Sequence, residues 1–202
     1  MAIASLHSNE LRRKRWTRPE CEALENSGIL NGQNVELIDG ELIDKTGTPR
    51  PHVHALALLA GWLTQVFGVR FVNLHAPIYV APEDNPTNEP QPDAIVLRPS
   101  FTDFETSVPH PADLLLVVEI SDSSLAFDRT VKAALYARAG IVEYWIVDVA
   151  GRRLLVHRDP SQGRYATVHV YDKTESVSPL AKPEAKLAIA SLFPVRPTPP
   201  TP

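Results

Sequence analysis

The segment Asp113–Ile120 is almost continuously apolar, and it limits the folds open to this chain more than any other feature. A strand that is apolar on both faces must lie between two covering layers, as inner strands of α/β sheets do. Residues 128–139 follow as an expected helix, with Asp128 as the N-cap and Gly140 at the C-terminal side. A second apolar strand, Tyr144–Asp148, comes next. Two buried strands joined through a helix form a parallel pair with a right-handed crossover.

Antiparallel elements are expected on both sides of this unit. Thr17 as N-cap, with Glu20 three residues later, predicts a helix that ends near Asn26. The Asp39-Gly40 pair lies between alternating apolar residues and predicts a hairpin turn. The remaining expected elements are a helix at 52–67, short strands at 70–74, 78–80 and 93–97, and a hairpin of 154–158 with 165–171. We therefore predict an α/β fold with a mixed central sheet flanked by helices.

The length of 202 residues suits one ordinary domain better than two. Hydrophobic side chains make up 44% of the chain and charged ones 22%, which is a globular balance. We expect a basic N-terminal arm at 1–16, a folded domain at 17–193 and a Pro-rich, disordered tail at 194–202. Residues 191–193 are expected to pack back on the domain. The basic residues between 12 and 18 suit contact with the DNA backbone or with a subunit surface or, as the alternative, a solvated surface.

Composition also limits the class of function. Cys21 is the single cysteine, which excludes an internal disulfide and a cysteine-based zinc site and is compatible with a cytoplasmic location. No segment has the length and apolarity of a membrane span, and the N-terminal residues do not resemble a signal peptide. The net charge of −4 neither supports nor excludes a nucleic-acid partner, because clustered carboxylates that bind a cation can produce it.

Two acidic residues and one lysine occupy informative places. Asp93 follows a Pro- and Asn-rich loop at the start of an expected strand, and Glu119 ends the most buried one. In open α/β sheets the carboxyl ends of strands border the crevice in which ligands bind. A buried carboxylate there needs a partner, which can be a divalent cation or Lys132 on the next helix.

This set of residues suits phosphodiester hydrolysis. Two carboxylates and a backbone carbonyl can hold Mg²⁺, with Mn²⁺ as a substitute, and leave positions for water. A nearby lysine can steady the attacking water and the phosphoryl charge. The alternative is a structural ion pair between Glu119 and Lys132, with Asp93 as an ordinary strand residue, because carboxylate spacing alone is a weak motif.

Four segments of the chain carry a resemblance to a known family. They are 35–42 (VELIDGEL), 91–97 (QPDAIVL), 114–121 (LLLVVEIS) and 132–148 (KAALYARAGIVEYWIVD). They resemble the Uma-type family of bacterial restriction endonucleases, over about Thr17 to Tyr171 and in the family's order. The resemblance implies a PD-(D/E)xK nuclease fold, a metal-dependent DNA endonuclease activity and a double-stranded DNA substrate.

The family's functional residues carry over one by one. Pro92-Asp93 matches its Pro-Asp pair and Glu119 its acidic strand residue, which implies that Asp93 and Glu119 are the metal ligands. Ser121 stands where the wider superfamily has lysine, and Lys132 matches the helix lysine that takes over in this family. The extra acidic position of such sites is matched by Glu36 or Glu41, two alternatives that flank the early hairpin.

Further candidates have structural alternatives. His52 and His54 precede or begin a helix and His75 lies downstream; a closed zinc site needs about three or four ligands, which the sequence does not supply. We take His54 as the histidine that approaches phosphate, with a polar helix-start residue as the alternative. Tyr136 lies four residues after Lys132 on the same helical face, where it orients the lysine or simply packs.

Three functions compete. The first is a magnesium-dependent DNA endonuclease, expected as a homodimer because cutting both strands of a duplex requires two active sites. The second is a catalytically inactive nuclease fold that binds nucleic acid or protein. The third is a glycosidase that uses two carboxylates without a metal and therefore works in EDTA. A serine hydrolase is disfavoured, because the chain has no Gly-x-Ser-x-Gly motif.

Overall fold

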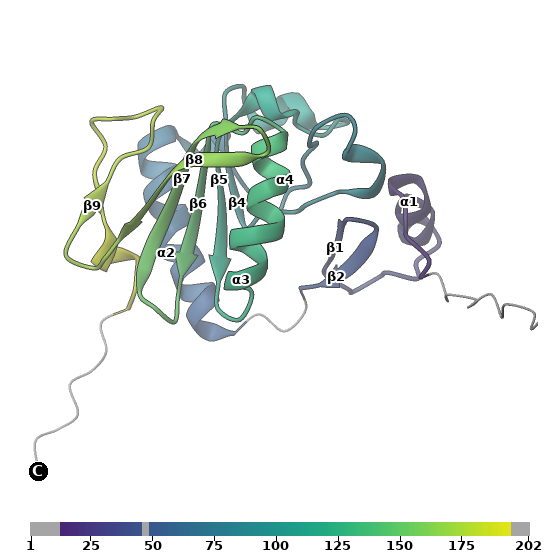
Figure 1. Cartoon of the computed structure of the whole chain (residues 1–202), viewed down its shortest axis with the longest axis horizontal. Coiled ribbons are helices and arrows are strands. Elements are labelled where there is room, and N and C mark those ends of the chain that lie inside the picture. The colour runs from purple at the N-terminus through teal and green to yellow at the C-terminus, as the bar shows by residue number, and fades with distance from the viewer. Residues whose placement is uncertain (1–12, 46–48, 195–202) are drawn as a thin grey trace, which may run out of the picture.

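The computed structural model describes residues 13–45 and 49–194, and a mixed six-stranded sheet forms its centre (Figure 1). The strand order is β3-β4-β5-β6-β7-β8. Their bounds are Val72–Leu74 (β3), Ala94–Leu97 (β4), Leu114–Ser121 (β5), Glu143–Asp148 (β6), Arg153–Ser161 (β7) and Arg164–Tyr171 (β8). β5 and β6 pair in parallel and every other neighbouring pair in this sheet is antiparallel, so the predicted parallel unit and α/β class are confirmed.

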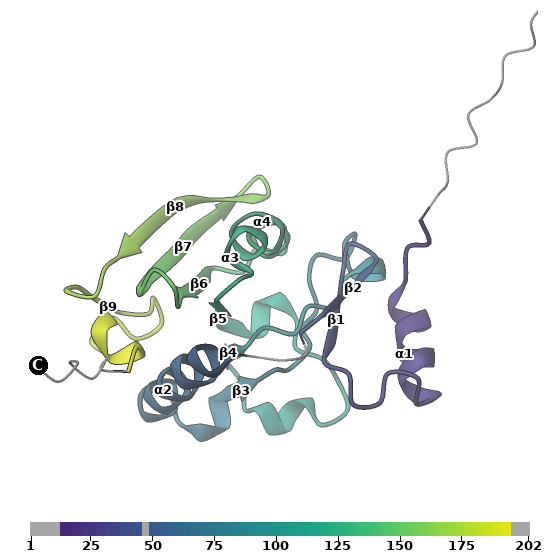
Figure 2. The same ribbon diagram turned by 90° about the horizontal axis from the view of Figure 1, so that it is seen from below.

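Helices cover both faces of the sheet (Figure 2). Helix α2 (Arg50–Phe67) packs on one face through Ala55, Leu59 and Leu63. The opposite face is covered by one helical stretch made of α3 (Leu125–Phe127), a π-helical turn (Asp128–Lys132) and α4 (Ala133–Arg138). Within the described residues no helix is long and apolar enough to cross a membrane.

The two-residue period of β5 divides its side chains between these faces. Val118 and Ile120 belong to the core under α2, whereas Val117 belongs to the core under α4. Successive side chains of a strand point to opposite faces, so Glu119 points toward α4. Tyr144 and Trp145 of β6 are fully buried.

A smaller unit precedes the sheet, in the chain segment at the right of Figure 1. Helix α1 (Arg18–Asn26) begins after Thr17, whose backbone N–H donates to the Glu20 carboxylate at 3.0 Å, as the capping box predicts. Strands β1 (Val35–Ile38) and β2 (Glu41–Asp44) form the predicted antiparallel hairpin. Asp39 and Gly40 have φ values of 48° and 74°, which the tight turn between them requires.

Several expected boundaries were wrong. Residues Ile78–Val80 form no strand, because their backbone N–H groups donate to Pro90, Pro109 and Asn85 in the surrounding loops. The strand expected at 70–74 is shortened by a 3-10 turn at Val69–Phe71. The helix expected at 128–139 begins earlier, after Ser124, so Asp128 lies inside it rather than capping it.

The C-terminal part closes the core beside α2. A short sheet of β9 (Ser176–Val177) and β10 (Leu187–Ala188) leads into a 3-10 turn at Ile189–Leu192. Leu192 and Phe193 are buried in the α2 core, which confirms the expected packing of 191–193. The other 3-10 turns are Asn85–Thr87, Phe101–Phe104 and Pro111–Asp113.

The terminal predictions fall mostly outside the described structure. Of the basic arm expected at 1–16, residues 13–16 are described, and of the tail expected at 194–202, only Pro194 is described.

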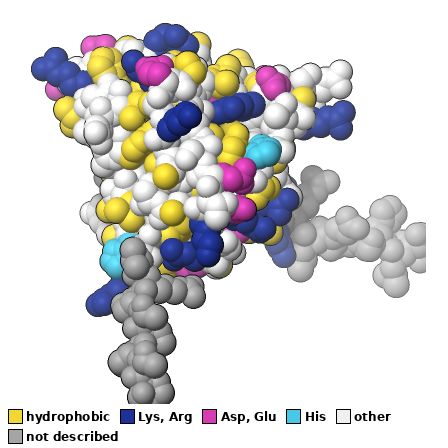
Figure 3. All heavy atoms as spheres, turned by 90° about the vertical axis from the view of Figure 1, so that its left-hand side faces the viewer, with side chains coloured by type: hydrophobic (Ala, Val, Ile, Leu, Met, Phe, Trp, Pro, Cys, Tyr) yellow, Lys and Arg dark blue, Asp and Glu magenta, His cyan; other side chains and the backbone are white. Residues whose placement is uncertain are grey.

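The side of the molecule that carries β9 shows basic, acidic and hydrophobic side chains interspersed rather than gathered by type (Figure 3). Arg18, one of the residues considered for DNA contact, instead donates to the carbonyl oxygens of Ile78 and Asn88.

Candidate active site

Strand pairing brings Asp93 and Glu119 together. Ala94 pairs with Val118 in the antiparallel β4–β5 ladder, so Asp93, one residue before β4, lies beside Glu119. The backbone N–H of Ile120 donates to Asp93 Oδ2 at 2.7 Å and joins the two strands at this point. Both carboxylates are about 2% exposed. Two residues far apart in the sequence therefore border one buried position.

The helical stretch supplies Lys132 and Tyr136 to the same carboxylate. Lys132 Nζ donates to Glu119 Oε1 at 2.8 Å, and the hydroxyl of Tyr136 donates to the same oxygen at 2.9 Å. Residues four apart in a helix share a face, which explains why both reach Glu119. Tyr136 packs in the core, which is one of the two roles considered from the sequence. The other was to orient Lys132, but its hydroxyl donates to Glu119 instead.

Of the two early acidic candidates, the structure brings Glu36 to this cluster. Its Oε1 lies 2.7 Å from Lys132 Nζ, and its Oε2 accepts from the backbone N–H of Gln91 at 3.1 Å. Glu41 is exposed beside the hairpin turn and does not line the cavity of the site. Ser121 lies two residues after Glu119 in β5, and its hydroxyl donates to Asp128 Oδ2 at 2.6 Å.

His52 and His75 line the cavity of the site, and His54 does not. His52 Nε2 lies 3.1 Å from Asp93 Oδ2, a distance at which its N–H donates to the carboxylate. His54 is exposed, because residues two positions apart in a helix are rotated by about 200° and point to opposite sides. His75 approaches from the other side, with Nδ1 3.6 Å from Asp93 Oδ1.

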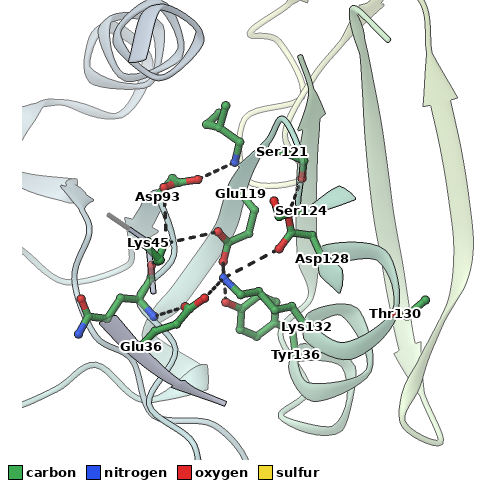
Figure 4. Close-up of polar contacts among 12 residues, drawn as sticks. Glu36, Lys45, Asp93, Glu119, Ser121, Ser124, Asp128, Thr130, Lys132 and Tyr136 are labelled. Atoms are coloured by element: carbon green, nitrogen blue, oxygen red, sulfur yellow. Dashed lines mark hydrogen bonds and ion pairs between the residues drawn. The ribbon is translucent and has the colours of Figure 1, made fainter. Parts of the chain in front are cut away.

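Lys45 is a site residue that the sequence did not indicate. Its Nζ donates to the carbonyl oxygen of Gln91 at 2.7 Å and lies 3.6 Å from Asp93 Oδ1 and 3.9 Å from Glu119 Oε2 (Figure 4). It directly follows β2, in the hairpin whose other strand carries Glu36. This shared hairpin is the one sequence feature that connects Lys45 with a predicted site residue. The contacts of Lys45 with Asp93 and Glu119 depend on how the hairpin packs against the sheet.

The two central carboxylates have opposite electrostatic settings. Burial raises the pKa of Glu119 to about 8, although Lys132 and Lys45 oppose the shift. Burial acts in the same direction on Asp93, but the hydrogen bond from His52 and the charge of Lys45 outweigh it and lower its pKa to about 2. The carboxylates around Lys132 outweigh the effect of its burial and raise the pKa of its ammonium group.

Negative charge exceeds positive charge in this cluster. The four carboxyl groups of Glu36, Asp93, Glu119 and Asp128 lie within 4.0 Å of two ammonium groups, those of Lys45 and Lys132. Crowded carboxylates favour protonation of one member, which agrees with the raised pKa of Glu119. A bound cation would relieve the same crowding.

A cavity of about 240 Å³ opens over these groups. Its lining includes Glu36, Lys45, His52, Asp93, Glu119 and Lys132. Asp93 Oδ1 is buried and makes no hydrogen bond to any described part of the chain, so it is available as a ligand. Among residues 13–45 and 49–194 no group of three or more His, Cys, Asp or Glu side chains is arranged to hold a metal ion. Two carboxylates with water fit Mg²⁺, which keeps several waters, better than a closed zinc site.

Comparisons with known proteins agree with this fold. The family model described as "Uma2: Putative restriction endonuclease" matches residues 18–190. A crystal structure from Anabaena variabilis ATCC 29413, described as "a putative nuclease belonging to DUF820", is similar with a TM-score of 0.59 and 17% sequence identity. The similarity covers 79% of this chain and 89% of that one. No curated protein matches the chain.

Proposed function

The chain belongs to the Uma2 family, whose description is restriction endonuclease, and we propose on that premise that it is a metal-dependent DNA endonuclease. The substrate is double-stranded DNA and the reaction is hydrolysis of a phosphodiester bond. The cofactor is Mg²⁺, with Mn²⁺ as a substitute.

One observation carries this proposal. Asp93 Oδ1 and Glu119 Oε2 come from neighbouring strands, and both face the position between them that Lys45 Nζ now approaches. The second oxygen of each carboxylate is already held, that of Asp93 by His52 and the Ile120 N–H, and that of Glu119 by Lys132 and Tyr136. Two carboxyl oxygens on neighbouring strands thus face one position beside an open cavity, which supports the proposal that a cation binds there.

Each side chain has a separate role in this proposal. Asp93 and Glu119 hold the metal, which when bound supplies Lewis acidity and an activated water. Lys132 lines the cavity next to Glu119, where its ammonium group steadies the attacking water and the charge that develops on the phosphoryl group. His52, Tyr136 and Glu36 fix the orientation of Asp93, Glu119 and Lys132 respectively.

Cutting both strands of a duplex requires two such sites. A closed two-fold dimer is the commonest way to supply them, so we propose a homodimer. The single cysteine, Cys21, is buried and fits a reducing cytoplasm, which we propose as the location. Light scattering at several concentrations measures the assembly, and a monomer throughout contradicts the dimer.

Plasmid cleavage tests the function. The full chain should nick or linearise plasmid DNA with Mg²⁺ or Mn²⁺, and EDTA should abolish the reaction. Asp93→Asn and Glu119→Gln should lose cleavage, whereas Asp103→Asn, an exposed aspartate outside the cavity, should retain it. DNA binding without cleavage in any metal contradicts the endonuclease and supports the binding-module alternative. Activity that persists in EDTA contradicts the metal.

A further inference from the structure

The two lysines of the site contact different oxygens of Glu119. Lys132 lies against Oε1, on the side of the helix, and Glu36 and Asp128 also surround its ammonium group. The Lys132 side chain is 2% exposed. Lys45 faces Oε2, on the side of the cavity, and its side chain is 16% exposed. Lys132 therefore shares the buried wall of the site, while Lys45 faces the oxygens that remain for a ligand.

Lys45 contacts both of those oxygens at once. Its Nζ is 3.6 Å from Asp93 Oδ1 and 3.9 Å from Glu119 Oε2, longer than a hydrogen bond in each case. Its hydrogen bond goes instead to the carbonyl oxygen of Gln91 at 2.7 Å. The ammonium group is thus held by a backbone carbonyl and acts on the two carboxyl groups through its charge, at ion-pair distance from both.

Lys45 is attached to the site at both its backbone and its charged end. Its backbone N–H donates to the carbonyl oxygen of Asn34 at 2.7 Å, which fixes the main chain at the end of the hairpin. The charge lies at the end of a flexible four-carbon stem that borders the cavity. A change of side-chain rotamer would take the ammonium group away from the carboxylates with the backbone in place, at the cost of its hydrogen bond to Gln91.

We propose that Lys45 is a built-in competitor for the divalent cation: its ammonium group occupies the electrostatic position between Asp93 and Glu119, and metal binding displaces it into the cavity. This inference rests on the proposed function, since it assumes that these two carboxylates are the metal ligands. In the absence of metal Lys45 stabilises the crowded carboxylates, and in its presence the same charge opposes binding. The metal affinity of the site is therefore set by a residue that is not itself a ligand.

Calorimetric titration of the full chain with Mn²⁺ and Mg²⁺, without DNA, tests this inference. Lys45→Met removes the charge and keeps the length of the side chain, so it should bind Mn²⁺ about tenfold or more tightly than the wild type, roughly 1.4 kcal/mol. Lys45→Arg keeps the charge and should stay near the wild-type affinity. Lys173→Met removes the same charge at an exposed position outside the cavity and should change nothing.

Thermal melts give a second readout that does not depend on DNA cleavage. Without metal Lys45→Met should melt below the wild type, and saturating Mn²⁺ should raise its Tm by more than that of the wild type. If Lys45→Met does not fold without metal, Lys45→Gln serves the same comparison.

The outcomes separate this inference from the function. Equal Mn²⁺ affinity in the wild type, Lys45→Met and Lys45→Gln overturns the competitor and leaves the endonuclease standing. Weaker binding in the neutral variants also overturns it, because Lys45 would then support the metal. Asp93→Asn is the ligand control and should not bind metal. If the wild type and the Lys45 variants do not bind metal either, both the competitor role of Lys45 and the proposed metal-dependent function are overturned.

Discussion

The hydroxyl of Tyr136 donates to Glu119 at 2.9 Å, on the oxygen that already accepts from Lys132. A buried tyrosine thereby helps to decide which oxygen of the carboxylate faces the cavity. The hydrogen bond also favours the ionised form of Glu119, against the burial that raises its pKa to about 8. The consequence can be measured with a single hydroxyl deletion.

Tyr136→Phe should weaken metal binding most at neutral pH. Loss of the donor raises the pKa of Glu119 further above its ordinary value, so the carboxylate that we propose as a metal ligand forms only at higher pH. The fold should lose about 1 kcal/mol of stability, as for one hydrogen bond. Calorimetric titrations with Mn²⁺ between about pH 6 and pH 9 measure the shift. Tyr165→Phe, which removes a buried hydroxyl that donates to Ile141, should leave the pH profile unchanged.

Lys132→Met should destabilise the protein by ~3–5 kcal/mol, because it leaves several buried carboxylates without their cation. Glu36→Gln in the same chain removes one of those negative charges, so the double variant should be more stable than Lys132→Met alone. Urea unfolding of the wild type, both single variants and the double variant provides the comparison. If Glu36→Gln makes Lys132→Met less stable still, the two groups do not form the electrostatic unit that their 2.7 Å distance indicates.

His52→Ala and His54→Ala form a matched pair. His52 holds Asp93 Oδ2, so its loss should raise the pKa of Asp93 from about 2 toward its ordinary value and weaken metal binding. Loss of an orienting residue next to a metal ligand costs about 10- to 100-fold in affinity. His54 is exposed, and its removal should not change the dissociation constant for Mn²⁺. Equal effects of the two substitutions would mean that the bond from His52 does not orient Asp93.

His157 should make the fold sensitive to acid. It is buried among the rings of Tyr144 and Tyr165, and burial lowers its pKa to about 4 from an ordinary value of 6.5. The folded state favours neutral imidazole, so this contribution is complete above pH 6.5 and is lost as the pH falls toward 4. The loss amounts to ~3 kcal/mol over that range.

His157→Phe keeps a ring in the same place and cannot titrate. Its stability should therefore fall less between neutral pH and about pH 4 than that of the wild type, as measured by urea unfolding at each pH. His169→Phe is the control, since His169 is exposed on β8 and should leave the wild-type pH dependence intact. A parallel decline in the wild type and His157→Phe would show that folding does not lower the pKa of His157.

The parts of the fold that were predictable are those in which local pattern and tertiary environment agree. The apolar run of β5 requires burial wherever the chain places it, and this gave both the parallel pair and the position of Glu119. Ile78 and Val80 show the limit of that reasoning. They are buried as a strand would be, yet their backbone bonds to loops, which apolar composition does not reveal.

The site divides along the same line. Asp93 directly precedes β4 and Glu119 lies within β5, two strands that the apolar pattern predicts, so the placement of both residues could be predicted. Lys45 and His52 reach the carboxylates because the hairpin and the start of α2 pack against that end of the sheet. Nothing local distinguishes them from other polar residues near element ends. The π-helical turn that precedes α4 was likewise not predicted from the sequence.

Because β4 and β5 are antiparallel, the distance between the Asp93 and Glu119 side chains does not depend on the number of residues between them in the sequence. Asp93 lies just before the start of β4, and Glu119 lies near the end of β5. The connecting segment from Arg98 to Asp113 therefore leaves and re-enters the sheet at the opposite end from the two carboxylates. Insertions or deletions in that segment should be tolerated during evolution, since they lengthen a detour and leave both endpoints in place. A slip of one residue in the β4–β5 ladder would be far more damaging, because it would turn a carboxylate toward the apolar core under α2.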